Sequence, residues 1–257
     1  MSDAPLIFTP EYYERMRRLE RVSWWNAGMR EIAARLLDDS ALPRSGTLLD
    51  VGCGSGQTMT WFETLREGWR TFGLDIADDG LHAARDSGAR VCRASALAIP
   101  FASHAVDLVV TFDVLQHLPL DGGDLQALRE IRRVLKPGGY CVVRTNAQAF
   151  PRTKADHAFE FRKYTPAELR ERLCAAGFTV DRLSRVNAVP GLAEIPRELR
   201  ARRADAGYHG LLSQPRTEPR WMDRVTLQCL RWEGAFVRAG GTLPFGRSIV
   251  ALCRACA

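Results

Sequence analysis

At residues 48–57 the chain reads Leu48-Leu49-Asp50-Val51-Gly52-Cys53-Gly54-Ser55-Gly56-Gln57. Its apolar beginning predicts a buried strand, and its glycines predict a tight turn that opens a helix. Glycines at positions 52, 54 and 56 allow the backbone to turn sharply and a ligand to lie against it. The dinucleotide-binding spacing G-x-G-x-x-G would need a glycine at position 57, where glutamine stands. The turn therefore indicates a cofactor other than a dinucleotide.

An acidic residue follows this turn at an informative distance. Asp75 ends the next predicted strand, nineteen residues after Gly56, where a carboxylate can accept hydrogen bonds from both hydroxyls of a ribose. Asp50, just before the turn, is placed to hold the turn's amides or an ammonium group of the ligand. A glycine turn alone is also typical of a plain strand-to-helix connection, but Asp75 at this spacing favours a nucleoside-containing ligand.

The rest of the chain alternates short β-rich runs with helical stretches, the pattern of strand-helix-strand units around a parallel sheet. The predicted strands are residues 47–51, 71–75, 90–94, 106–112, 140–145, 179–187 and 248–254, and the predicted helices between them are 57–66, 79–86, 125–135 and 166–176. Two helices are predicted within 10–37. Two more, 192–203 and 219–238, are predicted in an insert of about sixty residues that no ordinary strand connection requires. The fold class is therefore α/β.

Three further motifs accompany the glycine turn: Ile99-Pro100-Phe101, Val106-Asp107-Leu108-Val109-Val110 and Leu135-Lys136-Pro137-Gly138-Gly139. In this order and spacing they resemble class I S-adenosylmethionine-dependent methyltransferases, and more narrowly the bacterial small-molecule group with the type 11 methyltransferase domain. The resemblance implies a Rossmann-like seven-stranded sheet in the order 3-2-1-4-5-7-6, flanked by helices, with an antiparallel strand 7 at residues 248–254.

The resemblance also divides the chain. Residues 41–187 and 246–257 would form the S-adenosylmethionine-binding core. Residues 1–40 would form an N-terminal helical cap, and residues 188–245 a helical insert before strand 7 that acts as a cap or as an interface.

The same resemblance implies which residues hold S-adenosyl-L-methionine. The expected set is Gly52, Cys53, Gly54 and Gly56 at the methionine part, Asp75 at the ribose, Ile76 at the adenine, and Asp50, Ser95, Ala96 and Phe112 around them. Ser95-Ala96 stands where many relatives have Asp-Ala, so an acidic partner for the adenine amino group is missing. Trp25 and Arg30 resemble part of a Trp-Trp-x-x-x-Arg-Arg helix of some relatives, which would pair Arg30 with the cofactor carboxylate.

Methyl transfer from a sulfonium mainly requires that the acceptor be held in line and that water be excluded. His117 follows the fourth predicted strand at the carboxyl edge of the sheet and is the candidate base, with a turn-forming histidine as the alternative. The candidate substrate contacts are Tyr13, His157, Arg162 and Tyr164. A solvated loop is the alternative for the last three. No cluster of carboxylates indicates a metal site.

Composition limits the partners. The 257 residues carry 36 Lys+Arg and 30 Asp+Glu, and the excess of +6 is uneven: residues 1–150 hold 17 and 19 (−2), and residues 151–257 hold 19 and 11 (+8). A basic run is usually a solvated helix face, so nucleic-acid binding is disfavoured. The chain shows no run long enough to span a membrane, no secretory leader, and seven cysteines without a disulfide pattern. We therefore expect a cytoplasmic monomer or homodimer.

Three functions remain open at this point. The leading prediction is a methyltransferase for a small organic acceptor, such as a natural-product, sugar or lipid-linked intermediate. The second is a nucleic-acid or protein methyltransferase of the same fold. The third is a non-catalytic module that binds the cofactor.

Overall fold

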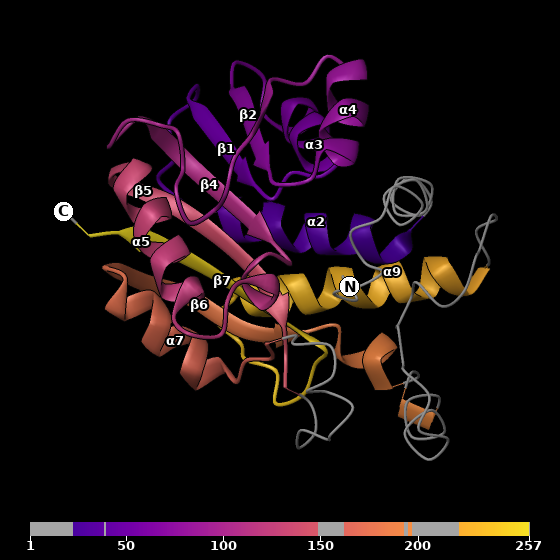
Figure 1. Cartoon of the computed structure of the whole chain (residues 1–257). Coiled ribbons are helices and arrows are strands. Elements are labelled where there is room, and N and C mark those ends of the chain that lie inside the picture. The colour runs from indigo at the N-terminus through magenta and orange to yellow at the C-terminus, as the bar shows by residue number, and fades with distance from the viewer. Residues whose placement is uncertain (1–22, 39, 149–161, 193–194, 197–220, 257) are drawn as a thin grey trace, which may run out of the picture.

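The computed structural model describes residues 23–38, 40–148, 162–192, 195–196 and 221–256. Its centre is a seven-stranded sheet in the order β3-β2-β1-β4-β5-β7-β6 (Figure 1). β7 runs antiparallel to β5 and β6, and the other neighbours are parallel. The predicted sheet order is confirmed. The strands are β1 (Thr47–Val51), β2 (Arg70–Asp75), β3 (Val91–Arg93), β4 (Val106–Phe112), β5 (Leu135–Asn146), β6 (Phe178–Val186) and β7 (Ser248–Ala255).

The helices are α2 (Trp24–Asp38), α3 (Gln57–Leu65), α4 (Asp78–Asp86), α5 (Gly123–Val134), α7 (Pro166–Ala175) and α9 (Trp221–Arg238), with a short 3-10 helix η2 (Leu115–His117). Most predicted bounds within the described residues hold to one or two positions. β5 starts earlier than predicted because Leu135 already pairs with Val106, before a bulge takes residues 136–139 out of register.

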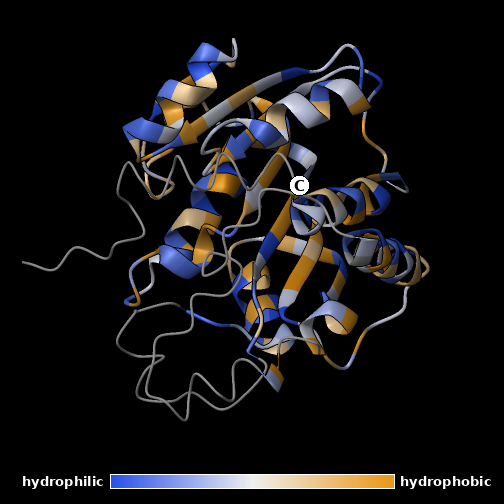
Figure 2. Cartoon of the chain, turned by 90° about the vertical axis from the view of Figure 1, so that its right-hand side faces the viewer, coloured by the Kyte–Doolittle hydropathy of each residue, from blue (hydrophilic) through white to orange (hydrophobic). Residues whose placement is uncertain are grey.

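One face of the sheet is covered by α5 and α7. α5 buries Ala127, Leu128, Ile131 and Val134, which recur at the spacing of one helical face. α7 begins at a capping box: the Thr165 hydroxyl accepts from the Glu168 amide at 3.2 Å, and the Glu168 carboxylate accepts from the Thr165 amide at 2.7 Å. Both helices pack on the apolar strands, which Figure 2 shows in the interior, and form the larger hydrophobic core.

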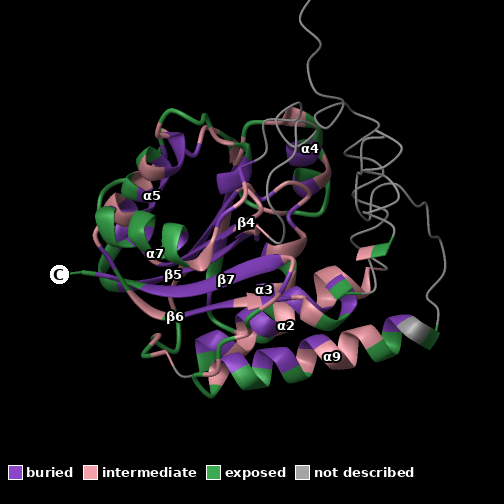
Figure 3. Cartoon of the chain, turned by 90° about the horizontal axis from the view of Figure 1, so that it is seen from below, coloured by how far each residue is buried: buried purple, intermediate pink, exposed green. Residues whose placement is uncertain are grey.

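The opposite face is covered by α2 and α9, which lie side by side in Figures 1 and 3. Arg231 donates to Glu31 at 2.7 Å and Arg238 to Asp38 at 3.1 Å, and each pair is separated by 200 residues. Because the separation is the same for both pairs, the two helices run parallel and in register. α2 buries Gly28, Met29, Ile32, Ala33, Leu36 and Leu37 in the second hydrophobic core.

The predicted outer segments are described only in part. Of the predicted cap at residues 1–40, α2 packs into the core as a layer of the fold, and residues 1–22 lie outside the described residues. Of the predicted insert at 188–245, α9 completes the same layer, and residues 193–194 and 197–220 lie outside. Roles as a cap or an interface stay predictions. Within the described ranges, no helix is long and apolar enough to cross a membrane.

Candidate cofactor and acceptor site

The glycine loop, residues 52–56, joins β1 to α3 at the carboxyl edge of the sheet. Gly52, Gly54 and Gly56 have φ values of 82°, 48° and 78°, a left-handed conformation that favours glycine. The amides of Gly52 and Cys53 donate to the Leu74 carbonyl at 2.8 and 3.0 Å, and the amide of Gly56 donates to the Cys53 carbonyl at 2.8 Å. These N–H groups are used within the protein, so they are not presented to a phosphate as in phosphate-binding loops.

Asp75 ends β2 beside the glycine loop. Its Oδ2 accepts from the Gly54 amide at 2.9 Å, and its Oδ1 accepts from the Ala77 amide at 3.0 Å. Each carboxylate oxygen has a further lone pair. Asp75 therefore fixes the loop and still has acceptor capacity for two ribose hydroxyls.

Space for a ligand lies over Gly54. A Cβ atom at this position would meet no atom within 4 Å, whereas a Cβ at Gly52 would lie 2.1 Å from Val114 and a Cβ at Gly56 would lie 3.2 Å from Ala84. Gly54 is thus the glycine of the loop that faces open space, beside the Asp75 carboxylate. A nucleoside ligand without phosphates fits this arrangement.

Four other predicted cofactor residues lie at the carboxyl ends of β1, β2 and β3. Ile76 follows β2 and is 56% exposed, as expected for a side chain that would cover an adenine. Ser95 and Ala96 follow β3, and the Ser95 hydroxyl accepts from the Leu97 amide at 3.1 Å. Asp50 is buried at the end of β1. Their contact with a cofactor stays a prediction.

Cys53 is also buried within the loop. Burial, with smaller contributions from Asp50 and Asp75, raises the pKa of the Cys53 thiol far above its usual range. The thiol is therefore neutral at physiological pH and forms part of the wall, not a nucleophile.

A second cluster, at the carboxyl ends of β4 and β5, was not predicted from the sequence as a unit. The Arg144 guanidinium lies 4.5 Å from the Trp25 ring centroid and 4.8 Å from the Phe112 ring centroid. It donates to Asp113 Oδ2 from Nε at 3.1 Å and from Nη2 at 2.5 Å. Trp25 and Phe112, predicted as cofactor residues, thus contact the guanidinium of an ion pair in which Arg144 is buried and Asp113 is half-buried. Arg30 lies about 140° around α2 from Trp25. One signal was visible in the sequence: a charged residue, Arg144, directly follows the apolar run at 140–143 of β5.

His117 ends η2 close to this cluster. Its side chain reaches the surface, but the surrounding protein desolvates it, and this lowers the pKa of His117 below 6.5 despite the opposing effect of the Asp113 charge. Its Nε2 lies 3.4 Å from the Gln116 side-chain nitrogen. A neutral imidazole at pH 7 is able to accept a proton, which is consistent with the predicted base.

Arg162 and Tyr164, predicted as substrate contacts, lie in a buried network around Asp124. Arg162 pairs with Asp124 and donates to the Pro119 carbonyl at 3.0 Å, and the Tyr164 hydroxyl donates to Asp124 Oδ2 at 3.1 Å. Burial opposes the ionised form of Asp124, but the hydrogen bond from Arg162 holds the Asp124 pKa below its usual value. The network anchors the connection after β5 to the start of α5.

The polar groups of Arg162 and Tyr164 thus make hydrogen bonds within the protein. Their contact with a substrate stays a prediction. Tyr13 and His157 lie outside the described residues. Among the described residues, no group of three or more His, Cys, Asp or Glu side chains could hold a metal ion.

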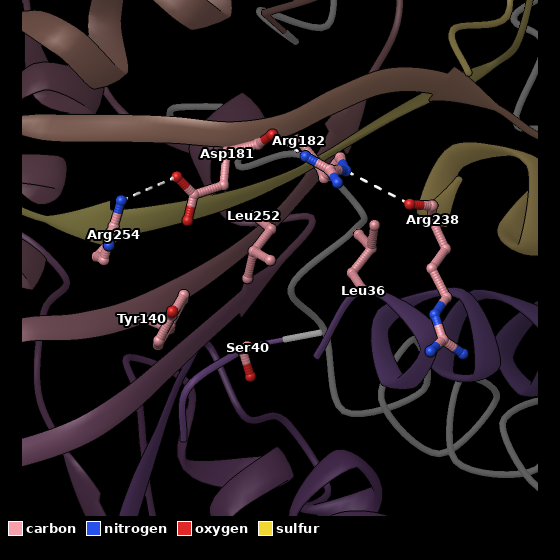
Figure 4. Close-up of a pocket in the computed structure, with 8 residues that line it drawn as sticks. All are labelled: Leu36, Ser40, Tyr140, Asp181, Arg182, Arg238, Leu252 and Arg254. Carbon is pink, nitrogen blue, oxygen red and sulfur yellow. Dashed lines mark hydrogen bonds and ion pairs between the residues drawn. The ribbon is translucent and has the colours of Figure 1, made fainter. Parts of the chain in front are cut away.

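A cavity of about 230 Å³ opens at the opposite, amino edge of the parallel strands (Figure 4). Two polar contacts border it. Arg254 lies 3.6 Å from the Asp181 carboxylate, and the Arg182 side chain donates to the backbone carbonyl of Arg238 at 3.4 Å. The cavity lies far along the sheet from the glycine loop, because Arg254 pairs with Tyr140 near the beginning of β5. It does not contribute to the candidate site.

Comparison with known proteins agrees with this geometry. The profile of a methyltransferase domain family matches residues 49–143. Residues 49–143 are a methyltransferase domain. The sheet order above is that of the class I methyltransferase fold.

Two curated relatives are similar in sequence to part of this chain. A probable S-adenosylmethionine-dependent methyltransferase of Mycolicibacterium smegmatis is 35% identical over 153 residues, 58% of either chain. A tRNA (carboxymethyluridine(34)-5-O)-methyltransferase of Arabidopsis thaliana is 30% identical over 103 residues, 40% of this chain and 24% of that protein. The chain thus matches 24% to 58% of the length of these relatives.

The fold is shared with solved methyltransferases. Phosphoethanolamine N-methyltransferase 2 of Haemonchus contortus, in complex with S-adenosyl-L-methionine, superposes with a TM-score of 0.64 at 16% identity, over 98% of this chain and 59% of that one. At this identity the likeness establishes the fold.

Proposed function

We propose that the chain is a methyltransferase (EC 2.1.1.-) that transfers a methyl group from S-adenosylmethionine to a small organic acceptor, such as a natural-product, sugar or lipid-linked intermediate. The carrying observation is the glycine loop: the amides of its three glycines donate within the protein, and the space over Gly54, beside Asp75, is open. Such a loop suits a nucleoside without phosphates better than a dinucleotide. We further propose a cytoplasmic location, as a monomer or homodimer.

The reaction requires the protein mainly to bind and orient the cofactor and the acceptor. The bound cofactor supplies an electrophilic methyl group on its sulfonium. Asp75 and Gly54 hold the cofactor, and the ends of β4 and β5 hold the acceptor on the side of β4 away from β2. His117, neutral at pH 7, takes the proton that the acceptor loses. The rings of Trp25 and Phe112 support a small organic acceptor.

Calorimetry tests the cofactor assignment. S-adenosylmethionine and S-adenosylhomocysteine should bind in the low micromolar range or tighter, roughly −8 kcal/mol, and NAD should not bind. Transfer of radiolabelled methyl groups to a panel of metabolites then identifies the acceptor. Binding of NAD without binding of either S-adenosyl compound would refute the proposal. Asp181→Asn, at the distant cavity, is the control and should bind as the wild type does.

A nucleic acid is the second candidate acceptor. The charge of +8 in residues 151–257 and the name of the Arabidopsis relative favour it. Methylation of RNA would then weaken steeply with salt, since each neutralised phosphate releases counterions. Turnover of a small acceptor that is insensitive to salt, with no methylation of bulk tRNA, would exclude this candidate.

A further inference from the structure

The Asp113 carboxylate uses its two oxygens unequally. Both guanidinium nitrogens of Arg144 converge on Oδ2, at 3.1 and 2.5 Å. Oδ1 is buried and has no hydrogen-bond partner. A buried acceptor left unsatisfied costs about 1–3 kcal/mol, and more if it is charged. Native proteins keep few such groups, so this oxygen requires an explanation.

The backbone at Asp113 is also unfavourable. Its φ is +60°, one of three positive values among the non-glycine residues that the structure describes. The left-handed conformation costs a residue with a Cβ atom roughly 1–2 kcal/mol. The Asp113 amide donates to the Arg144 carbonyl at 2.9 Å, which fixes the turn. Strain of this kind persists where the surrounding structure imposes it, and it is common at functional sites.

Arg144 is held as rigidly as its partner. Its guanidinium lies over the rings of both Trp25 and Phe112, and the residue is 7% exposed. Since Arg144 already balances the charge of Asp113, a second cation beside Oδ1 would be repelled by the guanidinium. The free oxygen therefore suits a neutral hydrogen-bond donor, a hydroxyl or an uncharged N–H.

The position of the free oxygen identifies the ligand that brings this donor. β4 lies between β1, which leads into the glycine loop, and β5, which carries Arg144. Asp75, the predicted ribose contact, lies on β2, on the other side of β1. Asp113 is close enough to His117 for its charge to act on the imidazole. Oδ1 and the proposed base thus serve the acceptor side of the site.

We infer that Asp113 Oδ1 accepts a hydrogen bond from the reacting hydroxyl or uncharged N–H of the acceptor, so that the enzyme methylates oxygen or nitrogen. This inference depends on the proposed function. The heteroatom lone pair forms the new bond to the methyl carbon while the sulfonium–methyl bond breaks. The proton passes along its hydrogen bond to Asp113 Oδ1, from there to His117 and then to water. Asp113 orients the donor, and Arg144 is a positioning residue that holds Asp113 in place.

Matched fragment pairs test the inference without knowledge of the natural acceptor. The probes are phenol with anisole, cyclohexanol with methoxycyclohexane, and aniline with N,N-dimethylaniline, each measured by ligand-observed NMR on the complex with S-adenosylhomocysteine. In each pair only the first member donates a hydrogen bond. For at least one pair we expect the donor to bind about tenfold or more tightly than its methylated partner, because a site built for a donor rejects an analogue without it.

Asp113→Asn should abolish this difference. The amide would turn its oxygen toward Arg144 and place its NH2 group where Oδ1 was, so a donor would face the fragment. Binding of S-adenosylhomocysteine and of 5′-methylthioadenosine should stay within twofold of wild type. Because the single variant leaves Arg144 without a counter-charge, the double variant Asp113→Asn/Arg144→Gln is measured as well and should give the same loss.

Two results would overturn the inference. One is that no pair distinguishes donor from methylated partner, or that Asp113→Asn leaves the difference intact. The other is that Asp113→Asn weakens S-adenosylhomocysteine but not 5′-methylthioadenosine, which lacks the amino-acid part, since Oδ1 would then serve the cofactor's ammonium. A failure of the proposed function is distinct: the wild type would not bind S-adenosylhomocysteine at all. Asp181→Asn, whose partner is Arg254 at the opposite edge, is the control.

Discussion

The two sides of the candidate site are built by different means. The cofactor half, the glycine loop with Asp75, is made from backbone and from one stretch of about thirty residues in β1–β2, and its hydrogen bonds close within that stretch. The acceptor half, Asp113, His117 and Arg144 with Trp25, is made from side chains that three separate segments bring together. A site made from one stretch of backbone requires particular residues throughout that stretch. A site made from side chains of separate segments can change its ligand when a single side chain is replaced. This difference suits a fold that keeps one cofactor and changes acceptors.

The largest expected effect tests the cofactor half. Gly54→Val places a branched side chain in the open space beside Asp75, and S-adenosylhomocysteine binding should fall below detection in calorimetry. Gly138→Val is the matched control, because Gly138 also has a positive φ, 74°, and open space around it, but lies at the opposite edge. Both variants carry similar backbone strain. If both bind equally well, the cofactor lies elsewhere.

Asp75→Ala comes next. It removes the acceptor of the Gly54 amide, which is also the proposed acceptor for the ribose hydroxyls, so cofactor binding should weaken by about 2–3 kcal/mol with little change in fold stability. Asp78→Ala, three residues away in an exposed ion pair with Arg93, should weaken binding by less than about 1 kcal/mol. Titration calorimetry of both variants measures the difference. Equal losses would mean that Asp75 acts only through the general charge of this edge.

A third change perturbs the packing of α2 against α9, the helical layer on one face of the sheet. In Gly28→Ala the new Cβ atom would lie 2.4 Å from Leu230 Cδ1, and we expect a loss of about 1–2 kcal/mol in the free energy of unfolding, after the gain in helix propensity. In Gly234→Ala the nearest atoms are at 3.1 Å, so its effect should be small. Denaturant unfolding measures stability, and S-adenosylhomocysteine affinity should not change. A large loss of affinity in Gly28→Ala would show that the layer shapes the site.

The smallest effect concerns pH. The pKa of His117 is lower in the folded chain than the usual 6.5, so the unfolded chain binds more protons, and stability falls as pH falls through 6.5 toward the lowered pKa of the folded chain. His117→Gln should flatten this slope and remove the acidic limb of kcat/KM. His82→Gln, on the exposed side of α4, should follow the wild type. An unchanged activity profile in His117→Gln would leave His117 as a turn residue.

The same contrast explains what sequence could predict. The glycine loop, Asp75 and the start of α7 after Thr165 follow from local patterns, whereas the strand order follows from the family resemblance. The ion pair of Asp113 with Arg144 does not, because nothing near Asp113 in sequence reports a positive φ or a partner on another strand. Arg162 and Tyr164 look like loop residues in sequence, and only the fold places them on the buried Asp124.

The parallel pairing of α2 with α9 also orders events during synthesis. A ribosome that adds about 5–20 residues per second needs roughly 10–40 s to make the 200 residues between Glu31 and Arg231. During that interval the strands β1 to β6 are themselves being made, β7 is still to come, and Met29, Ile32 and Leu36 lack the helix that covers their flank. The nascent chain therefore carries an apolar surface that closes only near the end of translation. A chain that stops before α9 would keep this surface exposed and would be a target for chaperones and proteases.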